Sequence, residues 1–164
     1  MDEEGLIERA EAFAKAHGCT ICERLGSRIH GIVIVLKSET NAAATALKVL
    51  ASAEPYRREC DIYERLREAR ITKLRGFHVP QLLRWDDDLL ALEMTIVTPP
   101  FALDFAGACI DFPPHFPDEA WEDWRRKNEE QFGEDWPKAQ AILAEFEQLG
   151  IYMLDPSPSN LRFR

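Results

Sequence analysis

The sequence has little of several features that each mark a class of protein. No apolar run approaches the ~20 residues that a membrane-spanning helix needs, so we expect no membrane association. The first residues, Met1–Glu4, are acidic, whereas a secretory or transit peptide is basic, and we expect a cytoplasmic protein. Basic residues are also scarce: 20 Lys and Arg stand against 29 Asp and Glu, a formal charge of −9. This charge disfavours binding to nucleic acid.

Cysteine is scarce too, with four residues at positions 19, 22, 60 and 109. Cys19 and Cys22 have the two-residue spacing of a zinc knuckle or a redox motif, but zinc needs a second close pair of ligands. The four histidines show no ligand spacing. We therefore expect reduced, buried structural thiols and no metal site built on cysteine.

What is present is the composition of a globular domain, with 46% hydrophobic and 30% charged residues in 164. Strand patterns fill the first half, helix patterns fill the second, and a proline-rich stretch over 98–117 separates them. We expect helices over 2–17, 55–70, 118–133 and 137–150, and strands over 20–25, 32–36, 46–50, 81–85 and 89–94. This order predicts an α+β fold with two parts that meet near residues 94–98.

Two groups of residues in the first half suggest chemistry at a phosphate. Gly26 and Gly31 lie between two expected strands, where glycine lets the backbone approach a phosphate; an ordinary hairpin turn is the alternative. Lys48 lies in an otherwise apolar strand, which is costly unless an anion such as Glu59 of the next helix pairs with it. An exposed edge-strand lysine is the alternative there.

A third group lies near the end of the sequence. Asp155 and Asn160 stand five positions apart in a proline- and serine-containing loop. An acid and an amide at this spacing can serve as a catalytic base and a metal ligand. Plain turn chemistry is the alternative, because Asp-Pro and Ser-Pro pairs are frequent in loops.

In this order the three groups resemble the protein-kinase-like family, over roughly residues 19–164. The amphipathic pattern predicts a separate N-terminal helix over 1–18. The resemblance implies a kinase-like N-lobe over 19–97, an antiparallel five-stranded sheet with one main helix. A reduced, mostly helical C-terminal part follows over 98–164. The resemblance also implies Asp155 as the catalytic residue and Asn160 as a metal ligand. It further implies a set of nucleotide-contacting residues: Gly26, Gly31, Val33, Ala46, Lys48, Glu59, Leu92, Glu93 and Met94.

The sequence departs from the family at several points. Arg28 replaces the middle glycine of the loop signature, and Met153 and Leu154 stand where the family has His and Arg. The sequence ends four residues after Asn160, so no Asp-Phe-Gly segment follows to supply the second metal ligand. Loss of a metal that neutralises phosphate charge costs roughly a thousandfold or more in rate.

We therefore expect a kinase-like protein, a truncated or degenerate phosphotransferase of the pseudokinase type, with at most a weak ATP-binding cleft. On this interpretation ATP and Mg²⁺ bind weakly or not at all. One alternative is an active ATP-dependent phosphotransferase, completed by a partner chain or by another acidic residue such as Asp104. The other is an interaction module with no nucleotide site, which would bind a protein partner or a second copy of itself.

Overall fold

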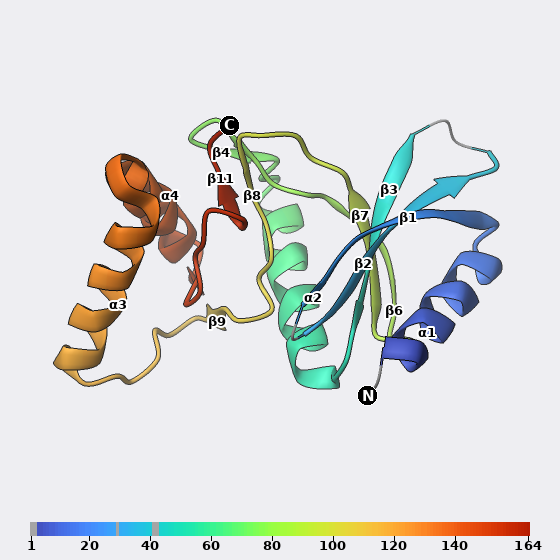
Figure 1. Cartoon of the computed structure of the whole chain (residues 1–164), viewed down its shortest axis with the longest axis horizontal. Coiled ribbons are helices and arrows are strands. Elements are labelled where there is room, and N and C mark those ends of the chain that lie inside the picture. Colours follow the sequence, from blue (N-terminus) through green and yellow to red (C-terminus); the bar gives the residue numbers. More distant parts are fainter. Residues whose placement is uncertain (1–2, 29, 41–42) are drawn as a thin grey trace.

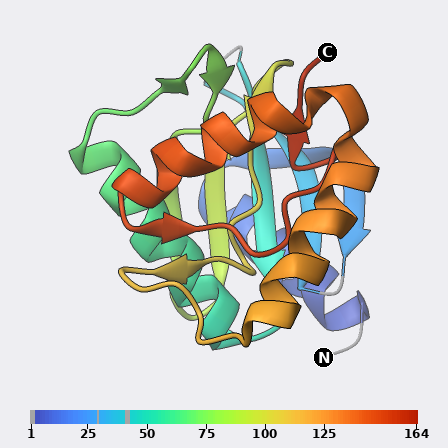
Figure 2. The same cartoon turned by 90° about the vertical axis from the view of Figure 1, so that its left-hand side faces the viewer.

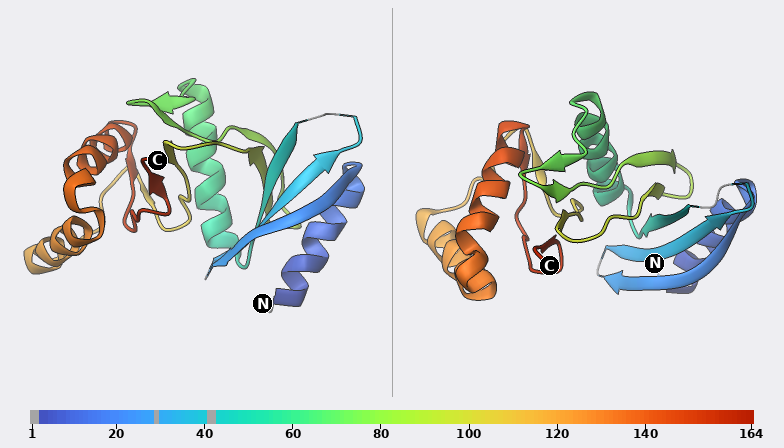
Figure 3. Two further views of the ribbon diagram at one scale, coloured as in Figure 1. Left: turned by 45° about the horizontal axis from the view of Figure 1, so that its top comes forward. Right: turned by 90° about the horizontal axis from the view of Figure 1, so that it is seen from above.

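The computed structural model describes residues 3–28, 30–40 and 43–164 and shows an α+β fold. A five-stranded sheet lies between helix α1 (Glu3–Ala16) and helix α2 (Ala53–Glu68), as Figures 1 and 3 show. Helices α3 (Asp118–Phe132) and α4 (Trp136–Gln148) lie beyond α2, on the side of the molecule away from α1. Two expected turn positions, Ile29 and Asn41, lie outside the described residues.

The sheet has the strand order β1-β2-β3-β7-β6, and every neighbouring pair is antiparallel. The expected antiparallel five-stranded sheet is confirmed. Its strands are β1 (Cys19–Arg28), β2 (Gly31–Ser38), β3 (Ala44–Leu50), β6 (Leu82–Asp86) and β7 (Ala91–Thr95). Because β7 lies between β3 and β6, the connection through α2 crosses one face of the sheet and covers it.

The two faces of the sheet bury different sets of side chains, since neighbouring residues in a strand point to opposite faces. The face toward α1 contributes Ile32, Ile34, Leu36, Leu47 and Val49, which pack against Leu6, Ala10 and Phe13 of the helix. The face toward α2 contributes Ala46, Leu92 and Met94 to a larger core. That larger core continues into α4 and the C-terminal segments, so both halves of the chain share it.

In the second half of the chain, the segment 101–110 pairs at both of its ends with the C-terminal segment 151–162. Strands β8 (Phe101–Ala102) and β11 (Leu161–Arg162) pair with each other, and β9 (Cys109–Ile110) pairs with β10 (Ile151–Tyr152). The loop 153–160 therefore starts and ends beside the segment 101–110 (Figure 2). Strand β8 also pairs with β5 (Phe77–His78), which pairs with β4 (Lys73–Leu74).

Most expected elements are present, with differences at short strands and ends. The two-residue strands β4, β5, β8 and β9 carry too few residues for a periodic pattern and were not expected. Helix α3 begins at Asp118, as expected, and Pro117 is its N-cap. No helix among the described residues is both long and apolar enough to cross a membrane.

The two glycines of the expected loop lie inside paired strands instead. Strand β1 continues through Gly26, which pairs with Val33, and Gly31 opens β2 opposite Leu50 of β3. A Cβ atom on Gly31 would lie 2.0 Å from the carbonyl oxygen of Val49, whereas one on Gly26 would meet no atom within 4 Å. Close approach of two strands, which needs no phosphate, therefore requires glycine at position 31.

Replacement of Gly31 by Ala should destabilise the fold, because the added methyl group collides with backbone that cannot move without breaking the β2–β3 pairing. We expect a loss of about 1–3 kcal/mol in the free energy of unfolding, measured by denaturant titration. Gly26→Ala is the matched control and should stay within about 0.5 kcal/mol of the wild type. Equal effects of the two substitutions would contradict the steric explanation.

Candidate functional site

Lys48 is the centre of the candidate site. It lies in β3 between Val33 of β2 and Leu92 of β7, on the face toward α2. Its Nζ atom lies 2.6 Å from Oε1 of Glu59, so the ion pair expected from the sequence forms. Glu59 is completely buried and Lys48 is 9% exposed. A buried ammonium group is tolerated only with such a partner.

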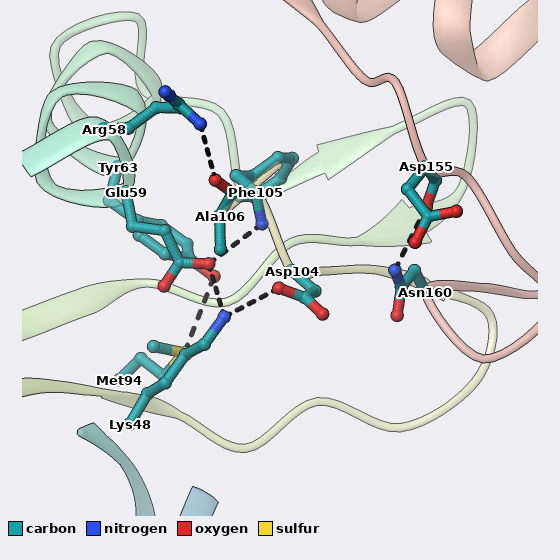
Figure 4. Close-up of polar contacts among 10 residues, drawn as sticks. All are labelled: Lys48, Arg58, Glu59, Tyr63, Met94, Asp104, Phe105, Ala106, Asp155 and Asn160. Atoms are coloured by element: carbon teal, nitrogen blue, oxygen red, sulfur yellow. Dashed lines mark hydrogen bonds and ion pairs between the residues drawn. The ribbon is translucent and has the colours of Figure 1, made fainter. Parts of the chain in front are cut away.

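A second carboxylate also reaches this ammonium group. Oδ1 of Asp104 lies 2.7 Å from Nζ of Lys48, which is held between Asp104 and Glu59 (Figure 4). Burial lowers the pKa of Lys48, but the two carboxylates outweigh burial and raise this pKa above its ordinary value. Burial raises the pKa of the Glu59 carboxyl group, against the lowering effect of Lys48. Lys48 therefore stays a cation at neutral pH.

Helix α2 fixes the backbone next to Asp104. Oε1 of Glu59 accepts a hydrogen bond from the Phe105 N–H (2.9 Å), and Arg58 donates one to the carbonyl oxygen of Ala106 (2.9 Å). Asp104 has a φ of 71°, in the left-handed region that few non-glycine residues adopt. Such a conformation persists only where the surroundings hold it. Here the two contacts from α2 and the buried ring of Phe105 hold the adjoining backbone.

A small pocket lies beside Asp104, with a cavity volume of about 40 Å³. Ordinary ligand pockets have about 300–1,000 Å³, so this one has room for an ion with a few waters and not for a nucleotide. Three segments line it, with the residues His30, Asp104, Gly107, Ala108, Met153, Leu154, Asp155 and Asn160. The expected catalytic residue and metal ligand therefore lie in one pocket with Asp104.

Backbone pairing brings Asn160 to the segment that carries Asp104. The N–H of Leu103 donates to the carbonyl oxygen of Asn160 (2.9 Å). The Asn160 side chain is buried, and its Nδ2 donates to the carbonyl oxygen of Asp155 (3.3 Å; Figure 4). Its Oδ1 is buried and accepts no hydrogen bond from the described residues. The bond from Nδ2 fixes the amide, so Oδ1 faces away from the Asp155 carbonyl.

The residues expected to contact the nucleobase lie in the core. Ala46, Leu92 and Met94 are each at most 7% exposed and pack with α2 and the C-terminal half, and Val33 packs against them. Among the described residues, none of these four lines the pocket beside Asp104. The structure thus brings Lys48, Asp155 and Asn160 to the surroundings of Asp104. The side chains expected to contact the nucleobase are packed in the core instead.

Glu93 does not join the other expected site residues. Its neighbours in β7 face α2, so its own side chain lies on the opposite face of the sheet. There its carboxylate accepts a hydrogen bond from Thr45 (2.6 Å) and pairs with Arg84 (2.6 Å). Glu93 therefore stabilises the sheet beneath α1 and does not reach Lys48.

Asp104 is the site residue that is hardest to predict from the sequence. The sequence named it only as one acidic residue that could complete the site. The available signal was the pair Asp104-Phe105, an acid followed by a large apolar anchor. The pairing of β8 with β11, which brings position 104 beside position 160, has no local sequence signature.

The thiols and histidines form no metal site among the residues that the structure describes. All four cysteines are free thiols. Cys22 is exposed and the other three are half-buried, which corrects the expectation that these thiols are buried. No group of three or more His, Cys, Asp or Glu side chains is placed to hold a metal ion in this part of the chain. A cation in the pocket beside Asp104 would therefore need the amide oxygen of Asn160 as well as carboxylates.

Replacement of Glu59 by Gln should strongly destabilise the protein, since it removes one of the two charges that balance the buried Lys48 ammonium group. We expect a loss of about 1.5–3 kcal/mol in the free energy of unfolding, the range for hydrogen bonds to charged groups, measured by denaturant titration. Glu54→Gln on the same helix is the control: it breaks the exposed pair with Arg58 and should cost less than about 0.5 kcal/mol. A Glu59→Gln protein as stable as the control would show that Lys48 does not depend on this pair.

Comparisons with known proteins give weak similarity to one kind of domain. No protein-family model and no curated protein matches the chain. Among solved structures, the chain is similar to the kinase domain of PknI from Mycobacterium tuberculosis and to a double mutant of that domain. Each match has a TM-score of 0.33 and 17% identity, and covers 75% of this chain and 48% of the other. The chain thus spans about half the length of that domain.

Proposed function

We propose that this chain is a kinase-like protein, a degenerate phosphotransferase that binds a magnesium–nucleoside triphosphate weakly and mainly through its phosphates. The observation that carries the proposal is the buried Lys48 ammonium group, held between Glu59 and Asp104 beside a pocket that Asp155 and Asn160 also line. A cation of this kind is ready to bind a phosphate oxygen, and an acid with an amide beside it suits a catalytic base and a metal ligand.

The packing of the cleft supports weak rather than tight binding. The side chains of Ala46, Leu92 and Met94, which a nucleobase would contact in a kinase-like protein, are buried in the core. The pocket of about 40 Å³ beside Asp104 is also too small for a triphosphate. Binding therefore requires the segment 104–108 to move, and the lost bonds from α2 to Phe105 and Ala106 reduce the affinity.

The proposal predicts that MgATP and magnesium tripolyphosphate stabilise the protein alike, because the base adds few contacts. A ligand at about ten times its Kd adds about 1.4 kcal/mol, a rise in Tm of roughly 3–6 °C for this chain length. Thermal unfolding should show a saturable rise for both ligands, lost in Lys48→Met and kept in the control Lys15→Met on α1. No rise with either ligand at saturating millimolar concentration would contradict the proposal and favour an interaction module.

Asp104 favours a second candidate function, an active phosphotransferase completed within this chain. Its carboxylate lines the same pocket as Asp155 and Asn160, where a second metal ligand is needed for efficient transfer. If the chain transfers phosphate, Asp155→Asn should lower the ATP turnover rate about a hundredfold or more, as expected for loss of a catalytic base. The measurement is release of ³²P-phosphate by purified protein, with Asp123→Asn on the surface of α3 as control. Turnover unaffected by Asp155→Asn would exclude this candidate.

A further inference from the structure

Three of the four tryptophans lie in a part of the chain that the proposed function does not use. Trp121 and Trp124 belong to α3, and Trp136 begins α4. Helix α3 buries only Asn128 and Phe132, so it adds little to the core. A tryptophan ring that packs on a core usually gives its N–H a hydrogen-bond partner. For Trp124 this partner lies beside the candidate site.

The indole of Trp124 binds the loop that carries Asp155. Its Nε1 atom donates a hydrogen bond to the carbonyl oxygen of Leu154 (2.7 Å), which is at the short end of the range for such bonds. This carbonyl belongs to the peptide group that joins Leu154 to Asp155. A peptide group is planar, so a bond to its oxygen also restricts the backbone nitrogen and Cα atom of Asp155.

The peptide group on the other side of Asp155 is held in a similar way. The carbonyl oxygen of Asp155 accepts the bond from Nδ2 of Asn160 (3.3 Å), and the next residue is Pro156, whose ring fixes its own φ. One hydrogen bond from α3 and one from the end of the loop therefore hold the backbone on both sides of Asp155. The Asp155 residue itself is exposed, so burial does not fix its position.

The side chains that precede Asp155 cannot replace the bond from the indole. Met153 is 6% exposed and packs in the larger core, and Leu154 is half-buried. A thioether and an aliphatic side chain have no N–H or O–H donor. They anchor the loop by apolar contact, which is not directional, whereas the bond from Trp124 specifies the orientation of one peptide group.

Trp124 is itself held by its surroundings. Nδ2 of Asn128, a residue only 3% exposed, donates to the carbonyl oxygen of Trp124 (2.8 Å). The Trp124 ring meets the ring of Trp136 edge to face, with centroids 6.0 Å apart, and Trp136 stacks on Phe132. These contacts join α3 to α4, which lie side by side in Figures 1 and 2. The packing of the two helices therefore sets the direction of the indole N–H.

We propose that Trp124 is a positioning residue of the candidate site. Its indole N–H holds the peptide group that precedes Asp155, and α3 thereby keeps the Asp155 carboxylate at the pocket that it lines. The inference rests on the proposed function for the role of Asp155 as a base. The order of the loop itself is a property of the ligand-free protein, so it can be tested without a nucleotide.

The test is native-state hydrogen exchange of the ligand-free full chain, followed by NMR, in wild type and Trp124→Phe. Phenylalanine keeps a ring against Trp136 and removes only the donor. The loop amides of Asn160 and Leu161 both donate to the carbonyl oxygen of Ser157. Their exchange should become about two- to tenfold faster, as expected for the loss of one hydrogen bond. The side-chain amide signals of Asn160 should also shift, because Nδ2 binds the Asp155 carbonyl oxygen.

Trp121→Phe is the matched control on the same helix. The Trp121 ring contacts Phe116 and Trp124, so its replacement also removes aromatic contacts. It should leave the loop amides and the Asn160 side-chain signals as in the wild type, even if the melting temperature falls. If Trp124→Phe does not fold, the wild type decides the question, since the bonded Trp124 indole N–H should exchange as slowly as the two loop amides.

Three results would overturn the inference: equal acceleration in the two variants, no acceleration in Trp124→Phe, or a Trp124 indole N–H that exchanges as fast as a solvated one. A loop that loosens only in Trp124→Phe, in a protein that MgATP does not stabilise, would support the positioning role and contradict only the proposed function. Stabilisation by MgATP with a loop indifferent to Trp124 would do the reverse.

Discussion

A lysine ammonium group buried in the sheet must have carboxylates around it, and this need joins three separate segments of the chain. Lys48 belongs to β3, Glu59 to α2, and Asp104 to the extended segment of the second half. The Glu59 carboxylate also binds the backbone of Phe105, so one buried oxygen connects the sheet, the helix and that segment. Because these buried charged contacts are costly to break, these segments keep their relative positions, and the pocket depends on them.

The same arrangement limits what the cleft can bind. Asp104 holds the ammonium group that would otherwise meet a phosphate, and Phe105 fills the core beside α2. Stability of the ligand-free protein is thus gained at the expense of space for a nucleotide. A phosphate that enters must compete with Asp104 for Lys48.

Much of this arrangement was predictable from local patterns, and the remainder depends on long-range pairing. Lys48 lies in an apolar strand and Glu59 lies on the buried face of the next helix. Because a buried charge needs a partner, these positions predict the ion pair between them. Asp155 and Asn160 were predicted from a short loop. Gly31 was assigned to a loop although strand contact explains it, because a glycine pattern alone does not distinguish a phosphate from a carbonyl oxygen. Asp104 joins the site through two-residue strands that carry no periodic signal.

The most direct test of the central claim is a crystal structure grown with Mn²⁺ and a non-hydrolysable ATP analogue, with diffraction measured at the manganese absorption edge. The account predicts an anomalous peak beside Asn160, with a phosphate oxygen near Nζ of Lys48 and the segment 104–108 displaced from its present position. Its nucleobase should be weakly ordered, because Ala46, Leu92 and Met94 are buried. An anomalous map without a peak in this pocket, or an analogue bound away from Lys48, would contradict the account.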